Sequence, residues 1–319
     1  MFGTRTPASL LDEQTYVLRT QLDGVLDGSA DAVHDSRIAT RRIRELLALV
    51  PAVPGREGEA DVATAYRAMG RAFGKVRDID VQIALIQHLT AYAPQTAPSL
   101  VLVRQDHEQE RLAKMRRLIK TLERLDVEAL LNFVGTGHPA GLRTRLTSTG
   151  WRQQLRRLLV ERSRTAIEAI SHATGVYFPN RAHRARIAIK QLRYAAEIAS
   201  GIGYSAMQPA IAELKKSQDV LGHLHDRQVL ADSLTRYLKR EGVDLEHITL
   251  TGQVLENEVM NLHARYLSHR EALRAASSDV ERAALQTVWT PSRLGVSTAL
   301  AVSGIVCVKA LSAARGPES

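Results

Sequence analysis

The sequence predicts an all-α protein built from two similar halves. Apolar residues recur every three or four positions, as at Leu18, Leu22 and Val25, and this period is typical of helices that bury one face. Aromatic residues make up only 4% of the chain, and the alternating β-branched pattern of strands is scarce. With 319 residues, 45% of them hydrophobic, the chain is long enough for two domains or for one domain of two halves.

Glycine- and proline-rich breaks divide the chain into eight predicted helices. In order, the breaks lie at 51–55, 93–98, 135–141, 175–180, 201–209 and around 242. The predicted helices span about residues 8–28, 31–50, 59–92, 98–134, 149–173, 181–200, 206–240 and 249–277. The 135–141 break separates four helices from four.

The C-terminal region, residues 286–319, is expected to add a ninth helix that ends near residue 311. Its apolar segment 294–308 is interrupted by Gly295 and Gly304 and is shorter than the roughly 20 apolar residues that a membrane-spanning helix needs. We therefore expect a packed helix rather than a membrane contact.

The charge and cysteine content of the chain indicate what kind of partner it binds and in which cellular compartment it is found. Lys and Arg number 43 against 34 Asp and Glu, a formal net charge of +9, which favours an anionic partner. Cys307 is the single cysteine, so no intramolecular disulfide can form, and this fits a reducing compartment. The first twelve residues lack the layout of a secretory signal. We expect a cytoplasmic protein.

The two halves share two sequence matches at nearly the same offset, which indicates a duplicated four-helix unit. Residues 33–44, VHDSRIATRRIR, align without a gap with residues 182–193, AHRARIAIKQLR, at an offset of 149. Residues 73–81, FGKVRDIDV, align with residues 221–229, LGHLHDRQV, at an offset of 148. The predicted halves are residues 8–134 and 149–285.

The first match places cations along one narrow helix face in each half. Positions i, i+3, i+7 and i+10 fall within about 80° of one another on a helix. Such a stripe contains no acid, although solvated helix faces usually mix signs because like charges destabilise neighbours. We therefore interpret the stripe as a binding face for an anion rather than as a solvated surface. Its members are His34, Arg37, Arg41 and Arg44 in the first half and His183, Arg186, Lys190 and Arg193 in the second.

Four other helices offer cations that could join these faces. The same spacing recurs on the fourth predicted helix, and the third and seventh carry glycines between cations, where a ligand or helix could approach the backbone. Asp78 and Asp226 are expected to orient nearby cations rather than to act in catalysis. The additional candidates are Arg104, His107, Arg111, Lys114, Arg67, Arg77, Lys215, His225 and Arg265.

The motifs His-x-x-Arg-x-Ala-x-Arg/Lys-x-x-Arg and Leu/Phe-Gly-x-x-Arg/His-Asp, each present twice, resemble those of the CHAD domain, the conserved histidine α-helical domain. The resemblance covers about residues 8–285. It implies two four-helix bundles related by a pseudo-twofold axis, with basic residues lining a central cavity or groove. It also implies binding of inorganic polyphosphate, association with polyphosphate granules, and no catalytic activity or cofactor. Arg42 matches a family position that is often basic, although its second-half equivalent is Gln191.

Three other functions stay open at this stage. A nucleic-acid binder is the second choice, since the chain has few aromatic residues for stacking on bases. A scaffold that docks an acidic protein partner is a third possibility. A phosphohydrolase is disfavoured because the stripe lacks a carboxylate cluster for a metal, and the Glu-x-Glu-x-Lys mark of triphosphate-tunnel enzymes does not occur.

Overall fold

The computed structural model describes residues 5–50, 57–135, 146, 150–241 and 245–286, and in these residues all regular structure is helical. The first half contains α1 (Pro7–Leu26), α2 (Ala30–Leu47), α3 (Glu57–Tyr92), α4 (Ala97–Arg124) and α5 (Val127–Gly135). The second half contains α7 (Gly150–His172), α8 (Pro179–Gly201), α9 (Gln208–Glu241) and α10 (Leu245–Leu285). Short 3-10 turns, Pro94–Thr96 and Ser205–Met207, precede α4 and α9. The all-α prediction is confirmed.

Local sequence signals explain where the first helices begin. The Thr6 side chain accepts a hydrogen bond from the backbone N–H of Ser9, 3.1 Å away, and Pro7 occupies the first position of α1, where its missing N–H costs nothing. Ser29 caps α2 in the same way through the N–H of Ala32. Gly28, with φ of 81°, makes the tight turn between these helices.

The predicted helix 98–134 is wrong in one respect, because the chain breaks it into α4 and α5 at Asp126. This residue has a φ of 43°, a left-handed conformation that aspartate tolerates better than most residues. Its side-chain oxygen then accepts a hydrogen bond from the N–H of Ala129, 3.2 Å away, and so caps α5. The last predicted helix, 249–277, is longer in the structure, and the predicted ninth helix lies outside the described residues.

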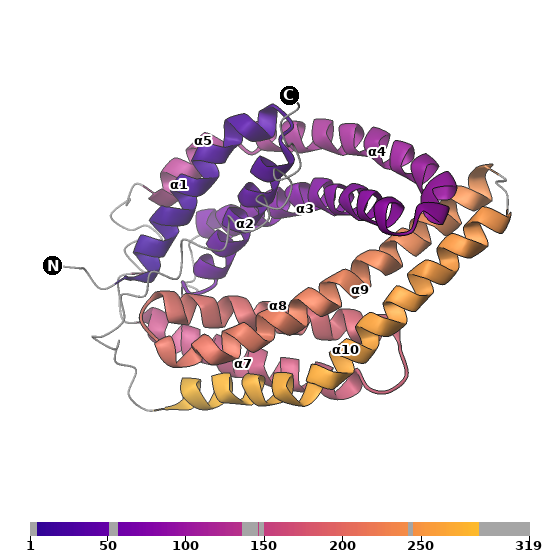
Figure 1. The fold of residues 1–319 in the computed structure, drawn as a ribbon. Coiled ribbons are helices and arrows are strands. Elements are labelled where there is room, and N and C mark those ends of the chain that lie inside the picture. The colour runs from indigo at the N-terminus through magenta and orange to yellow at the C-terminus, as the bar shows by residue number, and fades with distance from the viewer. Residues whose placement is uncertain (1–4, 51–56, 136–145, 147–149, 242–244, 287–319) are drawn as a thin grey trace, which may run out of the picture.

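Each half forms a circuit of packed helices (Figure 1). In the first half, α1 packs on α2, α2 on α3 and α3 on α4, and α5 returns to α1. In the second half, α7, α8, α9 and α10 pack in the same order and α10 returns to α7. Between the halves, α2 contacts α8, α3 contacts α9 and α4 contacts α10. Each of these three helices therefore meets its counterpart by sequence position.

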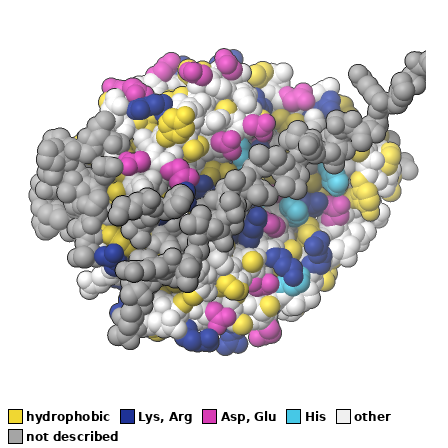
Figure 2. All heavy atoms as spheres, turned by 60° about the vertical axis from the view of Figure 1, so that its left-hand side comes forward, with side chains coloured by type: hydrophobic (Ala, Val, Ile, Leu, Met, Phe, Trp, Pro, Cys, Tyr) yellow, Lys and Arg dark blue, Asp and Glu magenta, His cyan; other side chains and the backbone are white. Residues whose placement is uncertain are grey.

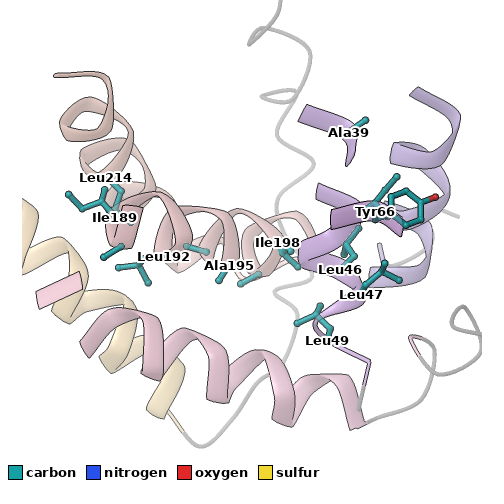
Figure 3. Close-up of a cluster of buried hydrophobic side chains, with 14 of the residues drawn as sticks. Ala39, Leu46, Leu47, Leu49, Tyr66, Ile189, Leu192, Ala195, Ile198 and Leu214 are labelled. Carbon is teal, nitrogen blue, oxygen red and sulfur yellow. The ribbon is translucent and has the colours of Figure 1, made fainter. Parts of the chain in front are cut away.

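Two hydrophobic cores hold the halves together. The larger one contains residues of both halves, among them Leu46 of α2 and Leu192 and Ile198 of α8 (Figure 3). A smaller core joins the far ends of the long helices, where Leu89 of α3 and Leu234 of α9 are buried in one cluster. Burial of each such side chain contributes about 2 kcal/mol. The two cores fix α2 and α3 opposite α8 and α9.

None of the described helices is long and apolar enough to cross a lipid bilayer.

Candidate anion-binding site

The two predicted stripes meet between the halves. Tyr194 of α8 is the point of contact: the guanidinium carbon of Arg41, on α2, lies 3.9 Å from its ring centre. The corresponding distances are 4.8 Å for the guanidinium carbon of Arg193 and 6.0 Å for the ammonium nitrogen of Lys190. Cations at this distance from an aromatic face are attracted to its negative π-cloud. A buried tyrosine thus gathers cations from both halves.

Helices α3 and α9 complete the site. On α9, the ring of His225 lies 5.0 Å from the ring of His183 on α8, and on α3 the charge of Arg77 acts on His34. We call the residues that these contacts and charges bring together the central basic cluster. Its members are His34, Arg37, Arg41, Arg77, His183, Arg186, Lys190, Arg193 and His225.

Two glycines on α3 face arginines of α2, but only Gly70 leaves room that a side chain would fill. A side chain at Gly70 would place its Cβ 3.3 Å from a guanidinium nitrogen of Arg44, which is tighter than an ordinary contact. At Gly74 the same construction meets Arg37 at 3.7 Å, an ordinary contact distance. Gly222, the counterpart on α9, has no atom within 4 Å, so helix packing does not require a glycine there.

Burial and like charge act on the cationic groups of the central cluster. Burial, followed by the charges of Arg37 and Arg186, lowers the pKa of Lys190 to about 7. Burial also lowers the pKa of Arg41 to about 10, an effect that the charge of an ionised Tyr194 hydroxyl would oppose. Burial of these groups and the repulsion between their like charges cost folding free energy, and nearby carboxylates offset only part of that cost. A bound anion would reduce it.

The histidines of the cluster have pKa values below the ordinary 6.5 of an imidazole. Burial is the largest cause in each case. It lowers the pKa of His34 together with the charge of Arg77, and it lowers the pKa of His183 together with the charge of Arg186. Burial and Arg186 lower the pKa of His225 to about 4. In the free protein these rings are therefore neutral at pH 7 and can donate one N–H each.

Acids that the stripe pattern did not reveal lie beside the cluster. Asp78 is 4.0 Å from Arg37, as its expected orienting role requires, but its side chain is 72% exposed, so this ion pair is weak. Arg193 forms a close ion pair with Glu197, one turn further along α8, and donates to Gln218 of α9 at 2.9 Å. Burial raises the pKa of Asp226. Sequence reasoning missed Glu197 as a site neighbour, although its i,i+4 spacing from Arg193 is a signal that could have identified it.

The α4 candidates have partners elsewhere. Arg111 donates to Asp80 of α3 at 2.5 Å and to the carbonyl oxygen of Gly28 at 2.9 Å, so it links α4 to α3 and to the α1–α2 turn. Arg104 lies 3.4 Å from Glu108, one turn along the same helix.

The rest of the α4 stripe is also engaged locally. Lys114 lies 2.8 Å from Glu110, and a different oxygen of Glu110 is 3.8 Å from the buried ring of His107. The spacing of this stripe matches that of α2, but its neighbours are carboxylates. The structure therefore does not bring the α4 candidates into the central basic cluster.

The remaining candidates lie at or beyond the edge of the cluster. Arg44 continues the α2 stripe toward α3. Burial is the main cause that lowers the pKa of Arg44, and the charge of Glu45 opposes it. The charges of Arg67 and Arg71, on α3, lower this pKa further. Arg42 donates to Gln14 of α1 at 3.4 Å, away from the α8 side. Lys215 and Arg265 are exposed on α9 and α10.

Figure 2 shows one face on which Lys, Arg and His side chains gather below and to the right of the grey segment, with a few acids among them. In the described part of the chain, no group of three or more His, Cys, Asp or Glu residues is placed to hold a metal ion. The arrangement is suited to neutralise and hydrogen-bond an anion that carries several charges, since Arg and Lys supply charged donors.

Comparisons with known proteins agree with this fold and these motifs. A CHAD domain from the plant Ricinus communis has a similar structure, with a TM-score of 0.62 and 19% identity over 85% of this chain and 90% of that one. PptA from Streptomyces chartreusis is also similar, with a TM-score of 0.54 and 14% identity over 86% of this chain and 98% of that one. No curated protein matches the sequence. The CHAD domain family profile matches residues 9–235, and the chain therefore belongs to the CHAD domain family.

Proposed function

We propose that this protein binds inorganic polyphosphate at the central basic cluster and does not cleave it. The observation that carries the proposal is the convergence of cations from both halves on Tyr194, in surroundings that lower the pKa of Lys190 to about 7. Folding brings these like charges together at a cost in stability, so their arrangement is best explained by an anion that they bind.

A linear phosphate polymer fits the cluster better than a compact anion does. Arginines grip phosphate oxygens through two parallel N–H donors, whereas a lysine acts as a point charge, and the cluster contains both kinds of group. It takes residues from four helices, α2, α3, α8 and α9. An extended ligand with a charge at every repeat unit could contact all four at once.

The chemistry of the cluster also supports a binding role rather than hydrolysis. Its members are hydrogen-bond donors, which stabilise charge. Of the acids beside it, Glu197 is engaged by Arg193, and Asp78 is exposed next to Arg37. Hydrolysis of a phosphoanhydride would need an activated water or nucleophile in addition to charge stabilisation.

The proposal is tested by titrating the purified protein with long-chain polyphosphate over a range of salt concentrations. Because each neutralised phosphate releases counterions, log K should fall linearly with the logarithm of salt concentration. RNA of matched total charge is the competitor, and we expect it to bind more weakly. Retention of RNA at lower concentration than polyphosphate would favour a nucleic-acid binder, and release of orthophosphate during the titration would contradict a non-catalytic role.

A further inference from the structure

A second cationic surface lies outside the central basic cluster, in a groove between α3 and α4. The groove has a volume of about 180 Å³, the space of several water molecules at about 30 Å³ each. Its apolar floor includes Ala68, Ala72 and Leu118. Five cations line it: Arg71, Lys75, Lys114, Arg117 and Arg124.

The charges of this groove are poorly balanced by the protein. Among the described residues, the one ion pair of its lining joins Lys114 to Glu110 on the same helix, at 2.8 Å. Arg71 and Lys75 are one turn apart on α3, and Lys114 and Arg117 are one turn apart on α4. Like charges at these spacings repel one another and destabilise a helix. As in the central cluster, an anion would remove this repulsion.

The groove is connected to the central cluster by a run of arginines. Arg41 and Arg44 are one turn apart on α2, and the guanidinium of Arg44 reaches the backbone of α3 at Gly70. Burial is the main cause that lowers the pKa of Arg44 there, and Glu45 opposes it. The charges of Arg67 and Arg71 lower this pKa further. Arg71 in turn lines the groove. Positive side chains therefore continue from one site to the other.

The second half carries different residues at two of the corresponding positions. At the two offsets of the repeat, 148 and 149, Arg71 corresponds to Asp219 or Val220 on α9. At the offset of 148, Lys75 corresponds to His223. The two cations of α3 are therefore not repeated at these positions of α9. A polymer held at the central cluster would thus find further cations on the first half.

We propose that the groove between α3 and α4 is a second phosphate-binding site, filled by an outlying stretch of the same polyphosphate chain that occupies the central basic cluster. This inference rests on the proposed function. The two sites act as linked binding modules for one ligand, so a chain long enough to reach both gains affinity over a chain that fills only the central cluster.

The test compares long-chain polyphosphate with tripolyphosphate on the full-length protein. The groove variant carries Lys75→Glu and Arg117→Glu, two exposed positions. Arg124 is left unchanged because its charge also stabilises the last turn of α4. The matched control carries Arg116→Glu and Lys120→Glu, which are exposed on α4, do not line the groove and change the net charge equally. Circular dichroism melting checks that both variants are folded.

We expect the groove variant to bind long-chain polyphosphate about tenfold or more weakly than the control, and tripolyphosphate within about threefold of the control. A loss for the long chain no larger than that of the control would overturn the groove site and leave the proposed function intact. An equal loss for both ligands would also overturn it, because the groove would then not be specific for long chains. If the wild-type protein bound neither ligand, the proposed function itself would fail.

Discussion

The guanidinium of Arg41, on α2, stacks on the ring of Tyr194, on α8, with its central carbon 3.9 Å from the ring centre. This contact joins the two halves of the chain at the middle of the central basic cluster. Arg193, the neighbour of Tyr194 in sequence, lies over the same ring at 4.8 Å. The aromatic face partly offsets the repulsion between the two arginines and so keeps both of them in place for an anion.

The ring of Tyr194, rather than its hydroxyl group, should therefore matter for binding. We expect Tyr194→Leu to weaken polyphosphate binding by about threefold to thirtyfold, the range that corresponds to about 0.5–2 kcal/mol for a cation–π contact. Tyr194→Phe keeps the ring and should bind within about twofold of wild type. Equal losses in the two variants, measured by titration at one salt concentration, would contradict this role of the ring.

Lys190 should make binding depend on pH above neutrality. Its pKa of about 7 in the free protein lies below the ordinary value of 10.5, and bound phosphate should raise it because phosphate favours the charged ammonium. Between these values the complex holds more protons than the free protein. The contribution of Lys190 to affinity should therefore be complete below about pH 7 and fall as pH rises above it, by at most about tenfold per unit for one proton.

Calorimetry can count this proton directly. At about pH 8, binding enthalpies measured in buffers of different ionisation enthalpy should reveal proton uptake by the wild type, and Lys190→Gln should abolish most of it. The histidines of the cluster, whose pKa values are lowered from 6.5, are neutral in the free protein at this pH. Unchanged uptake in the variant would show that another group titrates.

Arg111 should prove structural rather than part of the binding surface. Its partner Asp80 has a side chain only 6% exposed, so Arg111→Leu leaves a buried carboxylate without its cation. Such a loss should lower the free energy of unfolding by about 3 kcal/mol, measured by unfolding in guanidinium chloride. The polyphosphate affinity of the folded variant should not change. Adding Asp80→Leu should recover much of the stability. A large loss of affinity in the stable double variant would restore Arg111 to the binding site.

The helices and the binding stripes could be predicted from the sequence because both depend on periodicity within one segment. The spacing of His34, Arg37 and Arg41 identifies a shared face of α2 whatever packs against it. The break at Asp126 could not be predicted in this way, because no glycine or proline marks it and the aspartate adopts a left-handed conformation.

What a second helix brings to each stripe could not be predicted from spacing. Glu108 and Glu110 are one turn from Arg104 and Lys114 on α4, so the sequence shows these two pairs, whereas Asp80 of α3 meets Arg111 only through packing. Likewise, the stacking of Arg41 on Tyr194 depends on two helices that are far apart in sequence. A helical pattern determines which residues share a face, and only tertiary packing determines whether that face meets an acid, an aromatic ring or open solvent.

Binding at the central basic cluster is tested by the dissociation constant for long-chain polyphosphate of a variant with Arg41→Gln and Lys190→Gln. These changes remove two half-buried charges from the cluster, and melting of the variant checks that it is folded. Each charge-assisted contact contributes about 1.5–3 kcal/mol, so we predict a loss of at least about a hundredfold for the two changes together. Arg116→Gln with Lys120→Gln, the same charge change on the exposed face of α4, should cost less than about threefold. Equal affinities of the two variants would contradict binding at the central basic cluster.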